Sequence, residues 1–166
     1  YDDVEAMLIG EPTTGKILIE KNSEKPLGIA SMTKLMTYYL VKKDIAEGKI
    51  DPKQTVKISS SAAEFNVAGS SNYGLKAGET RTVEQLLMGM MVVSGNDAAA
   101  MLGEILAGSE QACAERMNQE AAALGMRNTH FVNASGFTVN GQYNTASARD
   151  MFILASALLK DFPEVR

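Results

Sequence analysis

Residues 30–40 have the sequence ASMTKLMTYYL, which begins like a helix. From Ser31 onward apolar residues recur at helical spacing and Gly48 ends the pattern, so we predict a buried amphipathic helix. Its apolar positions are Met32, Leu35, Met36, Tyr39 and Leu40. Residues three apart on a helix are neighbours on its surface. Ser31 and Lys34 should therefore lie side by side where this helix begins.

This spacing is suited to nucleophilic catalysis. A serine hydroxyl is a weak nucleophile until a base removes its proton, and Lys34 can be that base only if its amine is neutral. Its pKa must then fall from about 10.4 to roughly 7 to 8, which costs about 4 kcal/mol and requires burial beside the apolar stripe. The free N–H groups of the first helical turn would stabilise an oxyanion. Taken alone, the pattern also fits a capping serine beside a solvated lysine.

A second candidate is SGN, residues 94–96, which joins two apolar helical segments. We predict the first helix from a capping box, Thr82 with Gln85, to Val92. A turn held between two helices would fix Ser94 as a proton shuttle and Asn96 as an amide that orients substrate. The alternative is an ordinary helix-joining turn. The stretch SSN, residues 70–72, has the same spacing without flanking helices and ranks below it.

The remaining chain predicts two early strands, about five helices in all, and much irregular structure. VEAMLIG (4–10) and GKILIEKN (15–22) flank a turn and indicate an antiparallel pair, and TVKIS (55–59) indicates a short strand. Further helices should run from Ser109 to a stop at Gly125, and onward from an N-cap at Thr145. Two strands alone make a poor sheet, so we expect the sheet to be incomplete in this chain.

Composition limits the classes of function. The 166 residues are 45% hydrophobic and 22% charged, which predicts one folded unit with two lobes. The net charge of -4 is spread along the chain, so nucleic acid is not an expected partner. The longest apolar run, Leu86 to Val93, is too short to span a bilayer. One cysteine, Cys113, and one histidine, His130, are too few soft ligands for a zinc site, so no metal or cofactor is expected. Cys113 lies on the apolar face of a predicted helix and is assigned to the core.

SMTK (31–34) followed by SGNDAA (94–99) resembles the penicillin-recognising serine acyltransferases. Within that group the chain is most similar to the low-molecular-mass D-alanyl-D-alanine carboxypeptidases. Four phrases in the right order carry the resemblance: TGKILIEKNSEKPLGIASMTKLMT, RTVEQLLMGMMVVSGNDAA, LGMRNTHFVNASGF and YNTASARDM. They extend over nearly the whole chain.

The resemblance implies an α/β (α+β) fold of the β-lactamase/DD-peptidase type, in which a helical lobe is inserted into an antiparallel sheet. Residues 1–166 would form the N-terminal portion of a single catalytic domain. Residues 1–48 would supply sheet strands and the nucleophile helix, residues 49–143 a mostly helical lobe, and residues 144–166 a helix returning to the sheet. The active site would lie in the cleft between the lobes.

The resemblance also implies an activity. Ser31 would be the acylated nucleophile, Lys34 its base, Ser94 the proton relay to the leaving D-alanine, and Asn96 the group that binds the substrate amide. The substrate would be a peptidoglycan stem peptide ending in D-Ala-D-Ala, and β-lactams would acylate the same serine. Such an enzyme works outside the cytoplasmic membrane, in the periplasm or at the cell surface, as an exported mature form, with membrane anchoring through a missing C-terminal segment as an option.

The family's third motif, a lysine followed by serine or threonine and then glycine, is not present. No KTG or KSG occurs, and TTGK (13–16) has the wrong order. Loss of one oxyanion donor typically lowers the rate by about 100 to 1,000 fold, so we expect this chain alone to be nearly inactive unless a missing segment or a second chain completes the sheet.

Two alternatives remain open. A serine β-lactamase shares the first two motifs, but its ExxLN segment is absent, and a non-catalytic β-lactam sensor would stay acylated. His130 lies in NTHFVN, a stretch that resembles a structural part of the family, so we expect it to pack or hydrogen-bond. Asp97 is expected to favour the positive end of the following helix.

Overall fold

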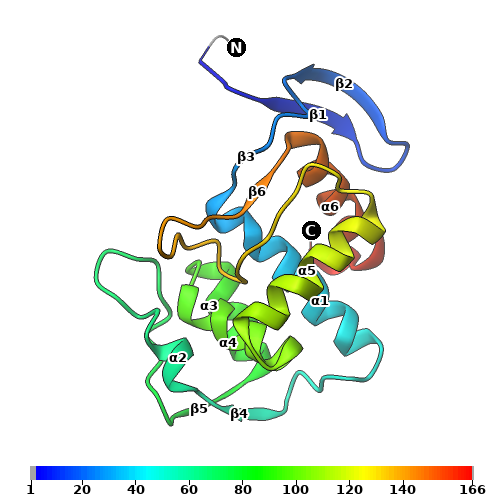
Figure 1. The fold of residues 1–166 in the computed structure, drawn as a ribbon. Coiled ribbons are helices and arrows are strands. Elements are labelled where there is room, and N and C mark those ends of the chain that lie inside the picture. Colours follow the sequence, from blue (N-terminus) through cyan, green and yellow to red (C-terminus); the bar gives the residue numbers. More distant parts are fainter. Residues whose placement is uncertain (1–2, 166) are drawn as a thin grey trace.

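The structure is a computed structural model that describes residues 3–165. Within them, the strands form three separate antiparallel pairs, each of two strands. The pairs are β1 (Met7–Glu11) with β2 (Lys16–Lys21), β3 (Leu27–Gly28) with β6 (Thr145–Ala146), and β4 (Thr55–Lys57) with β5 (Thr80–Thr82). Figure 1 shows the first pair at one end of the molecule and the third at the other. The predicted strand pair near the N-terminus is confirmed.

Helices make up most of the rest. They are η1 (Ala30–Thr33), α1 (Lys34–Ala46), α2 (Ser60–Ala63), α3 (Val83–Val92), α4 (Asn96–Ala107), α5 (Glu110–Leu124), α6 (Ala148–Asp161) and η2 (Pro163–Val165). Helix α1 contacts α3, α4, α5 and α6, so the predicted buried helix is the central element of the fold (Figure 1). The α+β class expected from the sequence is confirmed.

The core lies between α1 and the helices around it. Its largest fully buried apolar side chains come from all of these helices and include Met36, Leu40, Leu86, Met90, Leu102, Met117 and Leu154. Helix α4 is buried along most of its length because its small residues let neighbours approach closely: a Cβ on Gly103 would lie 3.0 Å from the Cβ of Ala134. Cys113 is fully buried there, as predicted.

Three predicted helix boundaries are confirmed by their caps. Thr82 caps α3 through a complete capping box with Gln85. Ser109 caps α5 by accepting the Ala112 N–H, and Gly125 ends the helix in the left-handed conformation. These signals are local, so the sequence alone identifies them.

Three expectations were wrong in detail. The last helix is capped by Ser147, which accepts the Asp150 N–H, whereas Thr145 belongs to β6, where its β-branched side chain suits the extended backbone. Met32 was assigned to the buried stripe but is 50% exposed, because the helix begins with the tighter η1 turn, which changes the direction of its side chains. Asn96 is the first residue of α4 and not part of the connection before it.

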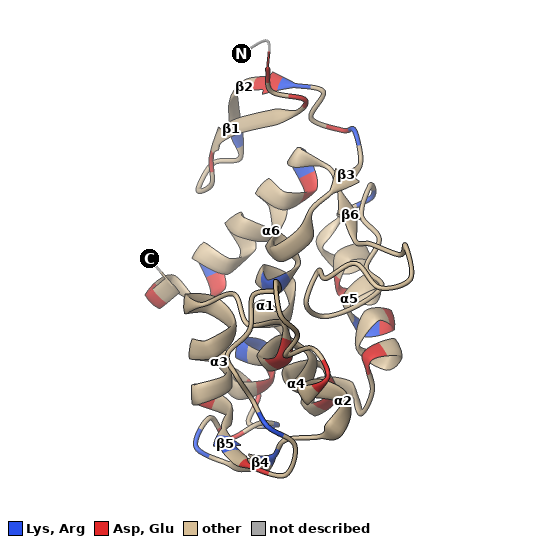
Figure 2. Ribbon diagram, turned by 90° about the vertical axis from the view of Figure 1, so that its left-hand side faces the viewer, with Lys and Arg blue, Asp and Glu red and all other residues tan. Residues whose placement is uncertain are grey.

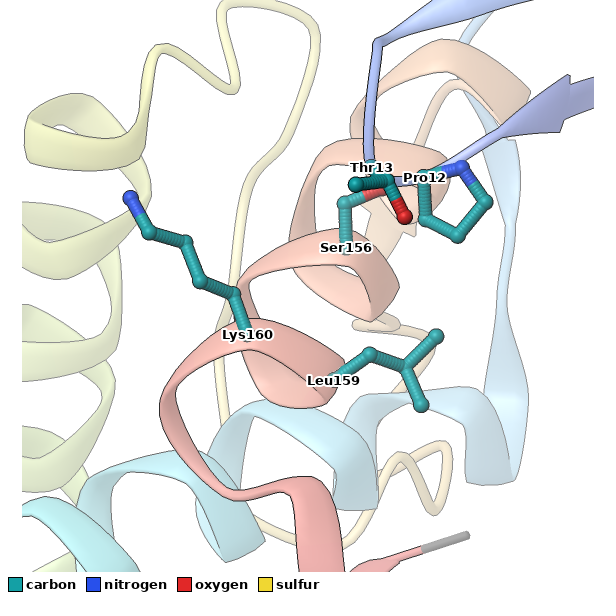
Figure 3. A pocket seen from close by; sticks show the side chains of 5 residues that line it. All are labelled: Pro12, Thr13, Ser156, Leu159 and Lys160. Atoms are coloured by element: carbon teal, nitrogen blue, oxygen red, sulfur yellow. The ribbon is translucent and has the colours of Figure 1, made fainter.

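Two hollows border the β1–β2 hairpin. An apolar groove of about 470 Å³ between the hairpin and α6 is lined by residues that include Leu8, Met32 and Phe152. A second hollow, of about 290 Å³, lies between the hairpin turn and α6 and is lined by Pro12, Thr13, Ser156, Leu159 and Lys160 (Figure 3). Neither shares a residue with the cleft that contains Ser31.

Lys and Arg residues lie among Asp and Glu residues on the elements seen in Figure 2. In the described part of the chain, no helix has both the length and the apolar content to cross a bilayer. Within residues 3–165, no three His, Cys, Asp or Glu side chains are grouped so that they could hold a metal ion.

Candidate active site

Ser31 and Lys34 lie where the η1 turn passes into α1, and their side chains meet. The Lys34 Nζ–Ser31 Oγ distance is 3.2 Å. Lys34 is only 3% exposed, and burial lowers the pKa of its amine to about 8. Burial disfavours the charged amine and shifts Lys34 toward its neutral form, as the apolar stripe beside it predicted.

The lysine amine has two further partners, and both are acceptors. Nζ donates to Asn96 Oδ1 at 2.8 Å and to the Ser135 carbonyl at 2.7 Å. A neutral amine carries two hydrogens and one lone pair. When the amine is neutral, its two hydrogens serve the two shorter contacts and its lone pair is directed at the Ser31 hydroxyl. This arrangement lets Lys34 accept a proton from Ser31.

Ser94 reaches the same hydroxyl from the connection between α3 and α4. Its Oγ donates to Ser31 Oγ at 3.1 Å. Ser94 has a φ of 57°, a left-handed conformation that costs a non-glycine residue about 1 to 3 kcal/mol. The next two residues hold it there, because Gly95 N–H donates to Gly89 O and Asn96 N–H donates to Ser71 O. The four residues singled out in the sequence are thus together: Ser31, Lys34, Ser94 and Asn96.

Asp97 binds residues 73–75 of the loop whose preceding residues, 69–71, line the cleft. Its fully buried carboxylate accepts the N–H groups of Tyr73 and Leu75, each at 2.8 Å, and that of Ala98 at 2.9 Å. It lies in the first turn of α4, as expected from the sequence. Its hold on residues 73–75 was not foreseen, because the loop shows no periodicity.

A turn at residues 133–136 borders the site, because Gly136 lines the cleft and the Ser135 carbonyl contacts Lys34. Gly136 has a φ of 81°, and a Cβ there would lie 1.9 Å from the Ala30 carbonyl oxygen, so only glycine fits. This close approach brings the Ser135 carbonyl to Lys34. Ser135 was not predicted, because it acts through a backbone carbonyl that has no side-chain signature; the residues NASG (133–136), which are typical of a turn, were the available signal.

The cleft itself has a volume of about 310 Å³ and exposes Ser31. Ser70, from the lower-ranked SSN stretch, also lines it, but its hydroxyl donates to Phe65 O and Val67 O within its own loop. His130 lies outside the cleft lining, and its backbone pairs with Thr145 in an isolated bridge. The His130 side chain is exposed, so the expected packing is wrong, and the hydrogen bonds to Thr145 are made by the backbone and not by the imidazole.

The fold is that of the DD-peptidases and penicillin-binding proteins. The chain resembles the crystal structure of the D-alanyl-D-alanine carboxypeptidase DacD from Francisella tularensis with a TM-score of 0.91 and 40% identity, over 98% of this chain and 38% of that one. It resembles penicillin-binding protein D2 from Listeria monocytogenes in its cefotaxime-bound form with a TM-score of 0.85 and 31% identity, over 97% of this chain and 64% of that one.

The sequence profile of the D-alanyl-D-alanine carboxypeptidases matches residues 3–166, and the chain belongs to this family. Among curated relatives, the D-alanyl-D-alanine carboxypeptidase DacF of Bacillus subtilis is 43% identical over 155 residues, which cover 93% of this chain. The match spans only 38% of the length of that relative. The family resemblance stated from the motifs is confirmed.

Proposed function

We propose that this chain is the N-terminal part of a serine D-Ala-D-Ala carboxypeptidase, with Ser31 as nucleophile and Lys34 as base. One observation carries the proposal: a buried amine that contacts Asn96 Oδ1, the Ser135 carbonyl and, at 3.2 Å, Ser31 Oγ, so that in its neutral form its lone pair is directed at Ser31. The relatives are D-alanyl-D-alanine carboxypeptidases, which indicates the substrate, a peptide ending in D-Ala-D-Ala.

The reaction follows from this geometry. Ser31 Oγ attacks the carbonyl carbon of the penultimate D-alanine as its proton passes to Lys34 Nζ. Ser94, 3.1 Å from Ser31 Oγ, gives its hydroxyl proton to the departing amine and takes the proton held by Lys34 in its place, so D-alanine leaves and an ester on Ser31 remains. Asn96 holds the acyl amide. Water, deprotonated by the same lysine, then hydrolyses the ester and restores the serine.

The proposal extends to the rest of the catalytic domain. We assign residues 1–48 and 144–166 to its sheet-bearing lobe and residues 49–143 to the helical lobe. A segment outside this chain would complete the sheet and supply the lysine-led third motif, with its carboxylate clamp and second oxyanion donor. The enzyme would act on peptidoglycan stem peptides outside the cytoplasmic membrane. β-Lactams would acylate Ser31, in line with the cefotaxime-bound Listeria relative.

The test uses the full-length protein that carries this chain. It is incubated with a fluorescent penicillin and, separately, with a D-Ala-D-Ala peptide, and label and free D-alanine are followed. We expect labelling and D-alanine release, both lost in Ser31→Ala. Rapid label loss with drug destruction would indicate a β-lactamase, and a permanent label without D-alanine release would indicate a sensor. Labelling of Ser31→Ala would refute the nucleophile assignment.

A further inference from the structure

Asn144 is a fully buried carboxamide with a partner for each of its hydrogen-bonding positions. Its Nδ2 donates to Thr33 Oγ1 at 2.8 Å and to the Asn133 carbonyl at 2.9 Å. Its Oδ1 accepts the Val132 N–H at 2.8 Å and the Asn133 N–H at 3.3 Å. A side-chain amide offers two donors and two acceptor positions, so nothing in this group is left free to bind substrate.

These bonds join the two segments that hold the lysine amine. Thr33 precedes Lys34 in the chain and belongs to the same turn as Ser31. Asn133 begins the turn whose Ser135 carbonyl accepts from Lys34 Nζ at 2.7 Å. Asn144 therefore bridges the backbone that carries the base and the backbone that orients it.

Other contacts brace the same turn, and Asn144 joins one of them, because its Nδ2 also lies 3.3 Å from Asn133 Oδ1. Asn133 Oδ1 accepts the Gly136 N–H at 2.7 Å, and Thr37 Oγ1 donates to the Ala134 carbonyl at 2.7 Å. The backbone carbonyl of Asn144 also accepts the Ile29 N–H, which ties it to the segment before η1. The Ser135 carbonyl is thus held at a fixed place relative to Lys34.

From this network we propose that Asn144 is a positioning residue for the general base, acting through Thr33 and the 133–136 turn. The inference rests on the proposed function, because it assigns the role of base to Lys34. If the Ser135 carbonyl moves, one amine hydrogen loses its acceptor and the lone pair is no longer directed at Ser31. A displacement of about 1 Å can lower a rate by about 100 fold. Loosening also admits water, which raises the pKa of a buried amine.

The matched control is Asn118, whose side chain binds the backbone of Phe131, two residues before the 133–136 turn. Its side chain donates to the Phe131 carbonyl and accepts the Phe131 N–H, both at 2.8 Å. It has no bond to the 133–136 turn or to η1 among the described residues. Asn118→Ala therefore removes a similar clamp without touching the support of Lys34.

The experiment measures acylation by a fluorescent penicillin in the full-length protein, by stopped flow, from about pH 6 to pH 10. The dissociation constant of the first complex and the acylation rate constant are fitted separately, and the burst amplitude gives the folded fraction. For Asn144→Ala we expect an acylation rate constant at least tenfold lower, an unchanged dissociation constant, and a pH midpoint raised by about one unit. Asn118→Ala should keep the rate constant and midpoint of the unmodified protein.

Thr33→Val is the second variant, because it removes the acceptor of the Asn144 amide while keeping the shape of the side chain. It should also lower the acylation rate constant. If Asn144→Ala does not fold, the result for Thr33→Val decides whether Asn144 positions Lys34. Unchanged rate constants and midpoints in the folded fraction of these variants would overturn the positioning role while leaving the proposed function intact. Labelling of Ser31→Ala would overturn both.

Discussion

Glu110 gives a pH dependence of stability that can be worked out from the structure. This residue begins α5, and burial raises the pKa of its carboxyl to about 7. The Ala134 N–H, which donates to Oε2 at 3.2 Å, opposes the rise, and the Glu104 carboxylate adds to it. Oε1 is buried with no hydrogen-bond partner. The folded state therefore favours the protonated carboxyl.

The sign and size follow by linkage. Between the ordinary pKa of 4.5 and the folded value of about 7, the folded protein binds more protons than the unfolded chain. The free energy of unfolding therefore falls as pH rises through this window and is level above it. A shift of between two and three units corresponds to a loss of about 3 to 4 kcal/mol, at about 1.4 kcal/mol per unit.

Urea unfolding at intervals from pH 4.5 to pH 8 measures this slope in the full-length protein. Glu110→Gln should remove the Glu110 contribution, because its amide does not titrate and its oxygen can still accept the Ala134 N–H. Glu115→Gln, an exposed change on the same helix, should leave the slope intact. If Glu110→Gln and the unmodified protein show the same slope, the carboxyl is not held protonated and the reasoning fails.

Three further outcomes are expected. Gly136→Ala should reduce penicillin acylation at least 100 fold in a rate assay, because the new Cβ would overlap the Ala30 carbonyl; a rate within tenfold would contradict this. The acylation rate should rise with pH to a midpoint near 8, the pKa of Lys34 set by its burial, and a midpoint above 10 would exclude a neutral amine. Asp44→Ala should lower the free energy of unfolding by about 3 kcal/mol in urea, since the Asp44 carboxylate is 5% exposed and binds Arg116 through both oxygens. A loss under 1 kcal/mol would show that the pair is solvent-screened.

The sequence predicted those parts of the site whose signals are local. Ser31 and Lys34 are three residues apart on one helix start, and Ser94 and Asn96 lie between two apolar helical runs. The caps of α3 and α5 have the same local character. Side-chain chemistry at fixed spacing is what a single sequence displays most directly.

The remaining parts depend on tertiary contacts. Ser135 acts through its backbone, and Asn133 and Asn144 look like turn-formers until the fold brings them together. The strands β3 and β6 have two residues each, too few to show a period of two. The cap at Thr145 was misplaced because Thr145 and Ser147 are both acceptable N-caps, and only the pairing of β6 with β3 distinguishes them.

The partners of Lys34 come from distant parts of the chain. Asn96 lies 62 positions away and Ser135 lies 101 positions away. Nascent or misfolded molecules that lack either long-range contact would keep an ordinary, protonated lysine and an inert serine. Covalent capture of a penicillin would therefore count only those molecules in which all three segments have docked, which makes the drug a reporter of native topology.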